Sequence, residues 1–372
     1  MFGARRSAEA AQRRDPLWAR LLVVVGALLI VASGGTIVGG KILISQYTDK
    51  IPRKPLLGSA AAKAEDGHAS INGPIDILLV GIDQRPDSPW QPIRSDSIII
   101  AHIPATHDQA YLISIPRDLL VDIPPYPRTR FRGGRDRINA AFAFGNENGG
   151  GREGGVELLG LTIKDLTGIE LNAAAIVDFG GFRAMVDKLG GVDMCIDQRV
   201  ESIHVGYGKD GKPRAKQPGD KPVVYDVGCR HLLPWEALDY IRQRHGLPNG
   251  DYDRQRHQQQ FLRAVLKEAK EQGVTHSPFK LYDIMSAAGD ALTVDLGGIS
   301  VEDWLFTLRM VIDNDLVMLK TNGGKIDSGT FNGASIEHLT EESRQMFEAV
   351  RADRLDAFVA QHPDFVGADE FG

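Results

Sequence analysis

Two short apolar runs, Ser97-Ile-Ile-Ile-Ala-His-Ile103 and Ala110-Tyr-Leu-Ile-Ser-Ile115, decide the fold of this 372-residue chain. Runs of this length that are rich in β-branched residues are typical of buried strands. Pro104 to Gln109 lies between them and reads as a turn, so the two runs predict a β-hairpin. A similar run from Ile75 to Val80 predicts a third strand before them.

Polar residues stand at the ends of these three runs. Asp83 follows the first run, Asp96 precedes the second, and Arg117 follows the third. If the three strands pair antiparallel, all three residues lie at one end of the sheet. Two carboxylates beside an arginine suit a divalent cation with phosphates, because Mg²⁺ usually binds through one or two carboxylates plus substrate phosphates. The alternative is that Asp83 and Asp96 only cap turns, which is common for aspartate.

A polar segment further along the chain joins two predicted helices. It reads Arg242-Gln-Arg-His-Gly-Leu-Pro-Asn-Gly-Asp-Tyr-Asp-Arg-Gln-Arg-His-Gln258 and follows an expected helix at Pro234 to Ile241. Apolar residues at helical spacing predict the second helix from about Asp253 to Gln272. On that helix Arg254 and Gln258 are four residues apart and share one face.

The arginines of this segment predict an anion site. Arg242 and Arg244 lie on one side if their backbone is extended, and Arg254 lies with Asp251 near the start of the second helix. A helix N-terminus carries a positive macrodipole and free N–H groups, and arginine binds phosphate oxygens bidentately. The alternative is a solvated surface turn with no ligand.

Helix and strand patterns alternate after residue 150, which predicts an α/β layer fold with helices covering a central sheet. The expected elements are a helix at Gly155–Thr167, a strand at Ala173–Phe179, a helix at Phe182–Leu189 and a strand at Gly191–Ile196. Further helices are expected near Pro278–Ala288, Val301–Met310 and Glu341–Val359, and Asn322–Asn332 is expected to be a Gly-rich loop.

The N-terminal region predicts a membrane anchor. Leu21 to Gly40 is uncharged and mostly apolar, which is about the length that spans a bilayer, and we assign residues 21–44 to this anchor. Residues 1–20 are rich in arginine and are expected to be cytoplasmic, so the rest of the chain would be extracytoplasmic. A cleaved signal peptide is the alternative. Residues 45–74 lack apolar periodicity and are expected to be a tether.

The cysteines predict a cross-link, and the net charge argues against one class of ligand. Cys195 and Cys229 are the two cysteines of the chain, and outside the cytoplasm such a pair is most simply a disulfide. A net charge of −6 argues against nucleic-acid binding. The arginines between Arg128 and Arg137 are expected to form a basic loop, either simply solvated or able to capture an anionic polymer or lipid headgroup.

Several motifs resemble, in order, those of the LytR-CpsA-Psr (LCP) family, whose members attach anionic glycopolymers to the bacterial cell wall. They are Gly81-Ile-Asp-Gln-Arg85, Arg94-Ser-Asp-Ser97, Ser114-Ile-Pro-Arg-Asp118, Arg137-Ile-Asn-Ala-Ala-Phe-Ala-Phe-Gly145, Tyr240-Ile-Arg-Gln-Arg-His245 and Gly250-Asp-Tyr-Asp-Arg-Gln-Arg-His-Gln-Gln-Gln260. One departure is Asp253, where the family more often has glycine.

The resemblance implies an extracytoplasmic catalytic domain at residues 75–340, with a three-layer α-β-α fold around a central mixed sheet. Residues 341–372 are expected to be a C-terminal helix and tail. By resemblance Asp83 and Asp96 hold Mg²⁺ (or Mn²⁺), and Arg94 and Arg117 contact a pyrophosphate. Arg242, Arg244 and Arg254 would stabilise charge on the leaving group, with Asp251 and Gln258 orienting them. Part of the core would open into an apolar pocket for a polyprenyl chain.

The function that the resemblance implies is a phosphotransferase. It would move a glycopolymer from a polyprenyl-pyrophosphate donor to peptidoglycan and form a phosphodiester bond. The chain has no GxSxG or HExxH motif, so phosphoryl chemistry by charged groups suits its residues better than nucleophilic or zinc hydrolysis. The alternatives are a polyprenyl-pyrophosphate hydrolase and a non-catalytic module that binds polyprenyl phosphate or regulates.

Overall fold

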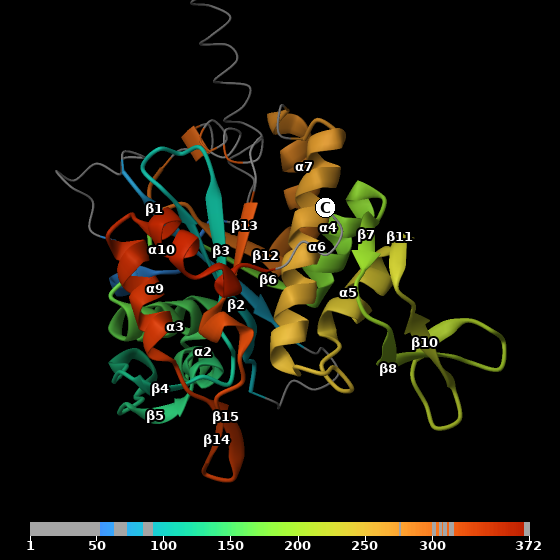
Figure 1. The fold of residues 1–372 in the computed structure, drawn as a ribbon, viewed down its shortest axis with the longest axis horizontal. Coiled ribbons are helices and arrows are strands. Elements are labelled where there is room, and N and C mark those ends of the chain that lie inside the picture. Colours follow the sequence, from blue (N-terminus) through green and yellow to red (C-terminus); the bar gives the residue numbers. More distant parts are fainter. Residues whose placement is uncertain are drawn as a thin grey trace, which may run out of the picture. The chain divides into compact units, whose positions relative to one another are not determined.

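The apolar runs at residues 75–115 form three strands of the central sheet (Figure 1). The computed structural model describes residues 53–62, 73–84, 92–274, 277–299, 303–304, 307, 311 and 316–367. Six strands form the sheet in the order β12-β6-β1-β2-β3-β13. They are β1 (Ile75–Ile82), β2 (Ser95–Ile103), β3 (Ala110–Ser114), β6 (Ala173–Asp178), β12 (Leu292–Asp295) and β13 (Leu316–Lys320).

The sheet is mixed, as expected. β2 pairs antiparallel with both β1 and β3, so the predicted hairpin is confirmed. β6 runs parallel to β1, and β13 runs parallel to β3, while β12 pairs antiparallel with β6. Because β1, β2 and β3 alternate in direction, the end of β1, the start of β2 and the end of β3 lie at one edge of the sheet.

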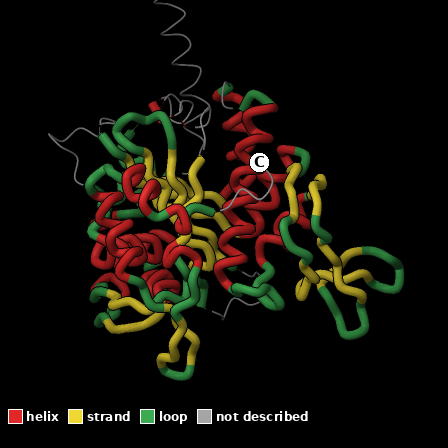
Figure 2. Tube along the Cα trace, in the orientation of Figure 1, coloured by secondary structure: helices red, strands yellow, loops and turns green. Residues whose placement is uncertain are grey.

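Helices cover both faces of this sheet (Figures 1 and 2). They are α2 (Ile138–Asn146), α3 (Gly151–Thr167), α4 (Phe179–Leu189), α5 (Pro234–Arg242), α6 (Asp251–Glu271), α7 (Pro278–Ala288), α9 (Glu341–Arg351) and α10 (Leu355–Gln361). Short 3₁₀ turns are η1 (Gly58–Ala60), η3 (Pro127–Thr129), η4 (Gly289–Ala291), η5 (Thr321–Gly324) and η6 (Pro363–Phe365).

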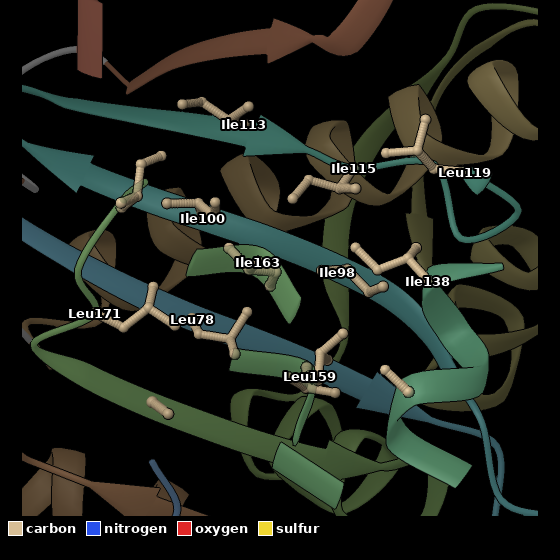
Figure 3. Close-up of a cluster of buried hydrophobic side chains, with 14 of the residues drawn as sticks. Leu78, Ile98, Ile100, Ile113, Ile115, Leu119, Ile138, Leu159, Ile163 and Leu171 are labelled. Carbon is tan, nitrogen blue, oxygen red and sulfur yellow. The ribbon is translucent and has the colours of Figure 1, made fainter. Parts of the chain in front are cut away.

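Alternating side chains of one strand pack against the two helical layers. In β2, Ile98 and Ile100 join the main core with α2, α3 and α9, whereas Ile99 and Ala101 join a second cluster that contacts Leu262 of α6. Figure 3 shows part of the main core, where Leu159 and Ile163 lie over the strands. Full burial of each such side chain stabilises the fold by about 1.5–3 kcal/mol.

Smaller ribbons and one small sheet flank the central sheet. The two-stranded ribbons are β4 (Leu120–Ile123) with β5 (Gly134–Arg137), β7 (Val192–Ile196) with β11 (Gly228–Leu232), and β14 (Ser328–Phe331) with β15 (Ala334–Glu337). The three-stranded sheet consists of β8 (Val200–Tyr207), β9 (Pro213–Ala215) and β10 (Lys221–Tyr225). The segment expected to be a basic loop is therefore partly a strand, because residues 134–137 pair with β4.

Part of the expected tether is folded. Leu56 and Leu57 are fully buried in the main core, and their backbone N–H groups donate to Asp295 Oδ2 at 2.7 and 3.0 Å. Two apolar neighbours in an otherwise polar segment give no periodicity, so the sequence pattern did not reveal this packing.

The C-terminal region also belongs to the main core. Instead of one helix over Glu341–Val359, the structure has α9 and α10, separated by Asp353 with a φ of 51°. Asp353 is held there because its Oδ2 accepts from Ala105 N at 3.1 Å and its Oδ1 lies 3.3 Å from His102 Nε2. Met346, Phe347 and Val350 are buried in the main core, so α9 packs on the domain within the region expected to be a C-terminal helix and tail.

Two expectations lie outside the described residues. The expected membrane anchor at residues 21–44 is one of them, and most of the helix expected at Val301–Met310 is the other. Among the residues that the structure does describe, no helix combines the length and the apolar character needed to cross a bilayer.

Candidate active site

A cavity of about 340 Å³ lies at the polar edge of the sheet, between β1, β2 and β6 on one side and α4, α5 and α6 on the other. Seven of the nine residues predicted for the site line it, and they come from distant parts of the chain. These are Asp83, Asp96, Arg117, Arg242, Arg244, Arg254 and Gln258. The fold therefore brings seven of the predicted residues together in one cavity.

A β-bulge directs Asp96 into the cavity. Gly81 and Ile82 are consecutive in β1, but they pair with Ser97 and Ser95 of β2, which leaves Asp96 without a partner residue. A bulge of this kind changes the direction of the extra side chain and is frequent beside active sites. Asp83 follows β1 directly, so both carboxylates reach the cavity from neighbouring strands.

Arg117 connects Asp96 to α6. Its Nη1 donates to Asp96 Oδ1 at 2.5 Å, and its Nε lies 3.9 Å from Asp251 Oδ1. Burial opposes the charged form of Arg117, but Asp96, Asp118 and Asp251 outweigh burial and raise the pKa of the guanidinium. Arg117 therefore remains a cation at the wall of the cavity.

The first turns of α6 place Arg254 and Gln258 as predicted. Arg254 is buried; its Nη2 forms an ion pair with Asp251 Oδ1 at 2.6 Å and donates a hydrogen bond to the carbonyl oxygen of Asp96 at 3.0 Å. Gln258 Oε1 accepts from Ser97 Oγ at 3.0 Å. The helix begins at Asp251, two residues earlier than expected.

Arg242 and Arg244 approach from the end of α5. The helix ends at Arg242, and Gln243 has an extended backbone, so the condition for the two arginines to share a side is met. The guanidinium of Arg242 lies over the ring of Phe179 at 4.1 Å and 3.7 Å from Asp83 Oδ2. Arg244 is exposed at the rim of the cavity.

Two predicted residues lie beside the cavity rather than in its wall. Asp251 contacts Arg254 and Arg117 but does not line the cavity. Arg94 precedes the bulge and is not among the residues that line the cavity. Nothing in the described contacts brings Arg94 to the other predicted residues.

The cavity also has a large apolar wall that the sequence did not place. It extends from the arginines along β1, β2, β6, α4 and α6, and includes Leu79, Ile99, Val177, Phe179, Phe182, Met185, Phe261 and Leu262. These residues read as ordinary core in the sequence, because only the spacing between α4 and α6 decides whether such side chains touch each other or leave a space.

Asp178 is a polar lining residue that was not predicted from the sequence. Its Oδ1 accepts from Gly181 N at 3.0 Å and caps α4, while its Oδ2 accepts from Arg152 Nη2 at 2.6 Å. Arg152 also donates to Gln84 Oε1 at 2.6 Å and so fixes the residue after Asp83. An aspartate between a strand and a helix is an N-cap signal, which could have identified it.

A family model and several relatives match this chain. The LytR_cpsA_psr family model matches residues 49–349. The chain belongs to this family.

Individual members of this family share less than a third of their residues with this chain where they align. The chain is 28% identical to a transferase of Bacillus cereus named polyisoprenyl-teichoic acid–peptidoglycan teichoic acid transferase TagU, over 80% of this chain and 83% of TagU. It is 26% identical to the cell wall biosynthesis protein LcpA of Corynebacterium glutamicum, over 77% of this chain. The match spans about half of LcpA, namely 56% of its length.

Solved structures show the same fold. A protein of Streptococcus agalactiae, gbs0355, superposes with a TM-score of 0.60 at 23% identity, covering 76% of this chain and 88% of that one. TagT of Bacillus subtilis superposes with a TM-score of 0.54 at 22% identity, covering 81% and 97%. The expected mixed α/β fold of the LytR_cpsA_psr family is thereby confirmed.

The acidic residues fit a divalent cation only together with a ligand. Among the residues that the structure describes, no group of three or more His, Cys, Asp or Glu side chains could hold a metal by itself. Asp83 and Asp96 supply two carboxylates at one end of the cavity, which matches the way Mg²⁺ is bound when phosphates complete its coordination.

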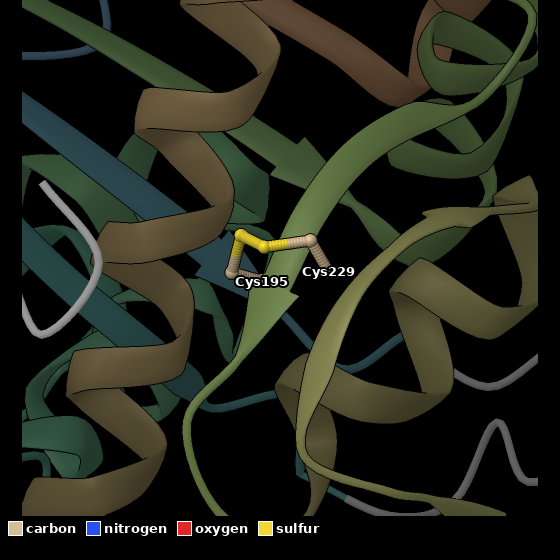
Figure 4. Close-up of a disulfide and its surroundings, with 2 residues drawn as sticks. All are labelled: Cys195 and Cys229. Carbon is tan, nitrogen blue, oxygen red and sulfur yellow. A yellow bond between two sulfur atoms is a disulfide. The ribbon is translucent and has the colours of Figure 1, made fainter.

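The predicted disulfide is confirmed. Cys195 of β7 and Cys229 of β11 face each other directly in the register of the ribbon and are bonded, with a Cα–Cα distance of 3.8 Å (Figure 4). In the chain-entropy description, closing a loop of this length stabilises the fold by about 3–4 kcal/mol.

Proposed function

We propose that this protein is a phosphotransferase that moves a glycopolymer from a polyprenyl-pyrophosphate carrier to peptidoglycan. The observation that carries the proposal is the composition of the cavity, where arginines and carboxylates at the polar edge continue into an apolar wall. A cavity with these two halves suits an amphipathic ligand with phosphates at one end and a hydrocarbon chain at the other. The names of TagU and LcpA support cell-wall chemistry for the relatives.

The reaction would break one phosphoanhydride bond and form one phosphodiester. A muramic acid 6-hydroxyl of peptidoglycan attacks the phosphorus that carries the glycan, the polyprenyl phosphate leaves with the bonding electrons, and the hydroxyl proton passes to a base or to solvent. Arg117, Arg242 and Arg254 surround the polar end, so they would bind the pyrophosphate and stabilise charge as it develops on the leaving oxygen.

A divalent cation would complete the polar end. Asp83 and Asp96 would hold Mg²⁺ or Mn²⁺, which supplies charge neutralisation between the carboxylates and the phosphates when it is bound. Arg117 and Arg242 pair with these carboxylates in the structure, and they would then be released toward the phosphate oxygens. Asp251 would keep Arg254 oriented.

The proposed function also predicts where the protein lies in the cell. Residues 21–44 would anchor the chain in the cell membrane with residues 1–20 in the cytoplasm, which keeps the catalytic domain near a lipid-linked donor. Arg94 precedes the bulge at Asp96, and we retain it as a residue that would meet the pyrophosphate only once a ligand is bound.

The test uses the full-length protein in detergent with a radiolabelled short-chain polyprenyl-pyrophosphate glycan, peptidoglycan and Mg²⁺. Wild type is compared with Arg244→Ala, Asp96→Ala and, as a matched arginine control, Arg199→Ala, whose side chain pairs with Glu201 and Asp226 and does not line the cavity. We expect label in peptidoglycan with wild type and Arg199→Ala, and a loss of about 100-fold with the other two.

Other results would replace the proposal. Soluble glycan phosphate without attachment to peptidoglycan would show a hydrolase that uses water as acceptor. Tight binding of the donor with no turnover at any acceptor concentration would show a non-catalytic binding module. Equal loss in Arg199→Ala and Arg244→Ala would show that the cavity is not the site.

A further inference from the structure

Helix α6 has two polar sides that contact different parts of the molecule. Arg254 and Gln258 lie four residues apart and line the cavity. Asp253, Arg256 and Gln260 lie on the far side of the same turns, since successive residues are about 100° apart around a helix. The proposed phosphate site uses the first side, and nothing in the mechanism above uses the second.

The far side of α6 is anchored to one buried carboxylate. Asp197 follows β7, its side chain is 1% exposed, and its Oδ2 accepts from Arg256 Nε at 2.7 Å and from Gln260 Nε2 at 2.9 Å. Its Oδ1 lies 3.4 Å from Nε2 of the fully buried His257. Burial opposes the ionised form, but these partners outweigh burial and hold the pKa of Asp197 below its ordinary value.

Arg256 extends this anchor to the loop before the helix. Its Nη1 donates to Asp253 Oδ1 at 2.7 Å, and Asp253 Oδ2 accepts from Asn249 N at 2.8 Å. Asp253 is also 1% exposed. One guanidinium therefore joins the end of β7, the first turn of α6 and the loop that leads from Arg244 to the helix.

The disulfide braces the strand that presents Asp197. Cys195 lies two residues before Asp197 and is bonded to Cys229 across the β7–β11 ribbon. Ile196, between the two, is fully buried in one cluster with Phe261 and Ala264 of α6. The backbone on which Asp197 stands is thus fixed both by a covalent bond and by packing on the helix.

We propose that Asp197 is a positioning residue which, through Arg256 and the strand braced by Cys195–Cys229, sets the orientation of the Arg254 face of α6 in the cavity. This rests on the proposed function for its effect on substrate, but the anchoring itself is independent of any ligand. A buried ion pair whose side chains can hardly move is suited to holding a helix in one orientation. The orientation matters because a small displacement of a phosphate-binding arginine has a large effect on the binding geometry.

The first experiment compares Asp197→Asn with Asp193→Asn in the full-length protein. Asp193 is the matched control, because it lies in β7, the strand that leads to Asp197, and pairs with His231, but its side chain is 72% exposed. Gln259 Nε2 donates to Ser114 Oγ at 2.8 Å and to the carbonyl oxygen of Leu319 at 2.9 Å, which keeps α6 on the sheet in either variant.

The readouts are hydrogen exchange of the backbone amides at residues 255–262 and the Kd for farnesyl pyrophosphate with Mg²⁺. We expect faster exchange in this segment alone and binding about tenfold weaker in Asp197→Asn, the scale on which a lost supporting contact affects a site. Asp193→Asn is expected to match wild type. The Cys195→Ser/Cys229→Ser double variant is expected to change both readouts in the same direction as Asp197→Asn.

A double-mutant cycle with Arg254→Ala separates positioning from general destabilisation. If Asp197 acts through Arg254, the double variant binds farnesyl pyrophosphate no more weakly than Arg254→Ala alone. If the losses in affinity of the two single variants multiply in the double variant, Asp197 does not act through Arg254. That result, or faster exchange throughout the central sheet, would overturn the inference in favour of a structural role.

The two proposals fail in different ways. If wild type binds farnesyl pyrophosphate and Asp197→Asn binds it equally well with unchanged exchange, the positioning role is wrong and the proposed function stands. If wild type does not bind the probe, the proposed function is wrong, and exchange in residues 255–262 alone then decides whether Asp197 holds the helix.

Discussion

At the scale of single residues, the buried histidine of α6 predicts how stability depends on pH. His257 is fully buried, its ring stacks on Tyr240 at 4.4 Å, and Asp197, Asp253 and Arg256 face it. Burial lowers the pKa of His257 from its ordinary value of 6.5, against the opposing effect of Asp197. The unfolded chain therefore binds a proton near pH 6.5 while the folded chain does not.

The sign of the pH dependence follows from this difference in proton binding between the unfolded and the folded chain. Stability is retained above pH 6.5 and is lost as pH falls below it, by up to about 1.4 kcal/mol in the free energy of unfolding per pH unit. Urea unfolding at several pH values between 7.5 and 5 measures this slope. In His257→Gln the slope is expected to decrease.

His231→Gln is the control, because the hydrogen bond that His231 Nδ1 donates to Asp193 raises the pKa of this exposed histidine and gives a contribution of opposite sign. That contribution is present below pH 6.5 and is lost as pH rises through the raised pKa. A wild-type slope that His257→Gln leaves unchanged would show that another group is responsible.

At the scale of elements, helices α2 and α3 pack through glycines that leave no room for a side chain. A Cβ on Gly154 would lie 2.3 Å from the carbonyl oxygen of Gly145, and one on Gly155 would lie 2.7 Å from the ring of Phe142. We expect Gly154→Ala to lower the free energy of unfolding by about 1–3 kcal/mol, because backbone has to move. The midpoint of urea unfolding measures the loss.

Gly134→Ala is the matched control for that substitution. Gly134 lies in exposed strand β5 and a Cβ there would meet nothing within 4 Å, so we expect little change in stability. The packing matters to the site as well, since the first residues of α2 are tied to the segment that carries Arg117: Asn139 N donates to the carbonyl oxygen of Arg117 at 3.1 Å. An unchanged midpoint in Gly154→Ala would show that the two helices are free to separate.

The same scale shows why the sequence could predict that the polar residues of the cavity lie together, but could not place its apolar wall. Strands β1, β2 and β3 were predictable because their apolar runs are continuous, and antiparallel pairing alone then brings Asp83, Asp96 and Arg117 to one edge. The bulge at Asp96 depends on which residues pair, and the apolar wall depends on the separation of α4 and α6. Neither has a local sequence pattern.

Long-range pairing limits prediction in the same way. β13 joins β3 across about 200 residues of chain, with Leu316 opposite Ala110. The contacts between Asp197 and Arg256 also join residues 59 apart. A charged residue whose partner is this distant reads as surface in the sequence, so the anchor on the far side of α6 was not predicted.

At the scale of the whole molecule, the folded unit is closed by segments from both ends of the described chain. Leu56 and Leu57, near one end, and Phe347 and Phe358, near the other, belong to the same main core as β1 and β2. Asp295, at the end of β12, holds residues 56 and 57 through their backbone N–H groups. We therefore expect the segment 53–62 to stabilise the domain rather than to link it.

Leu57→Ala tests this expectation. Removing a fully buried leucine side chain costs about 2–5 kcal/mol in the free energy of unfolding, because it leaves a cavity in addition to the lost burial. Ser59→Ala is the control in the same segment: only the hydrogen bond from Ser59 Oγ to Glu157 Oε1 is lost, while the backbone N–H of residue 59 still donates to Glu157, and we expect a change below about 1 kcal/mol. Thermal and urea unfolding measure the stability of both variants.

If residues 53–62 were only a tether, the two variants would be equally stable, and a chain that begins at residue 64 would unfold at the wild-type temperature. If the segment belongs to the core, that shortened chain unfolds at a lower temperature than wild type.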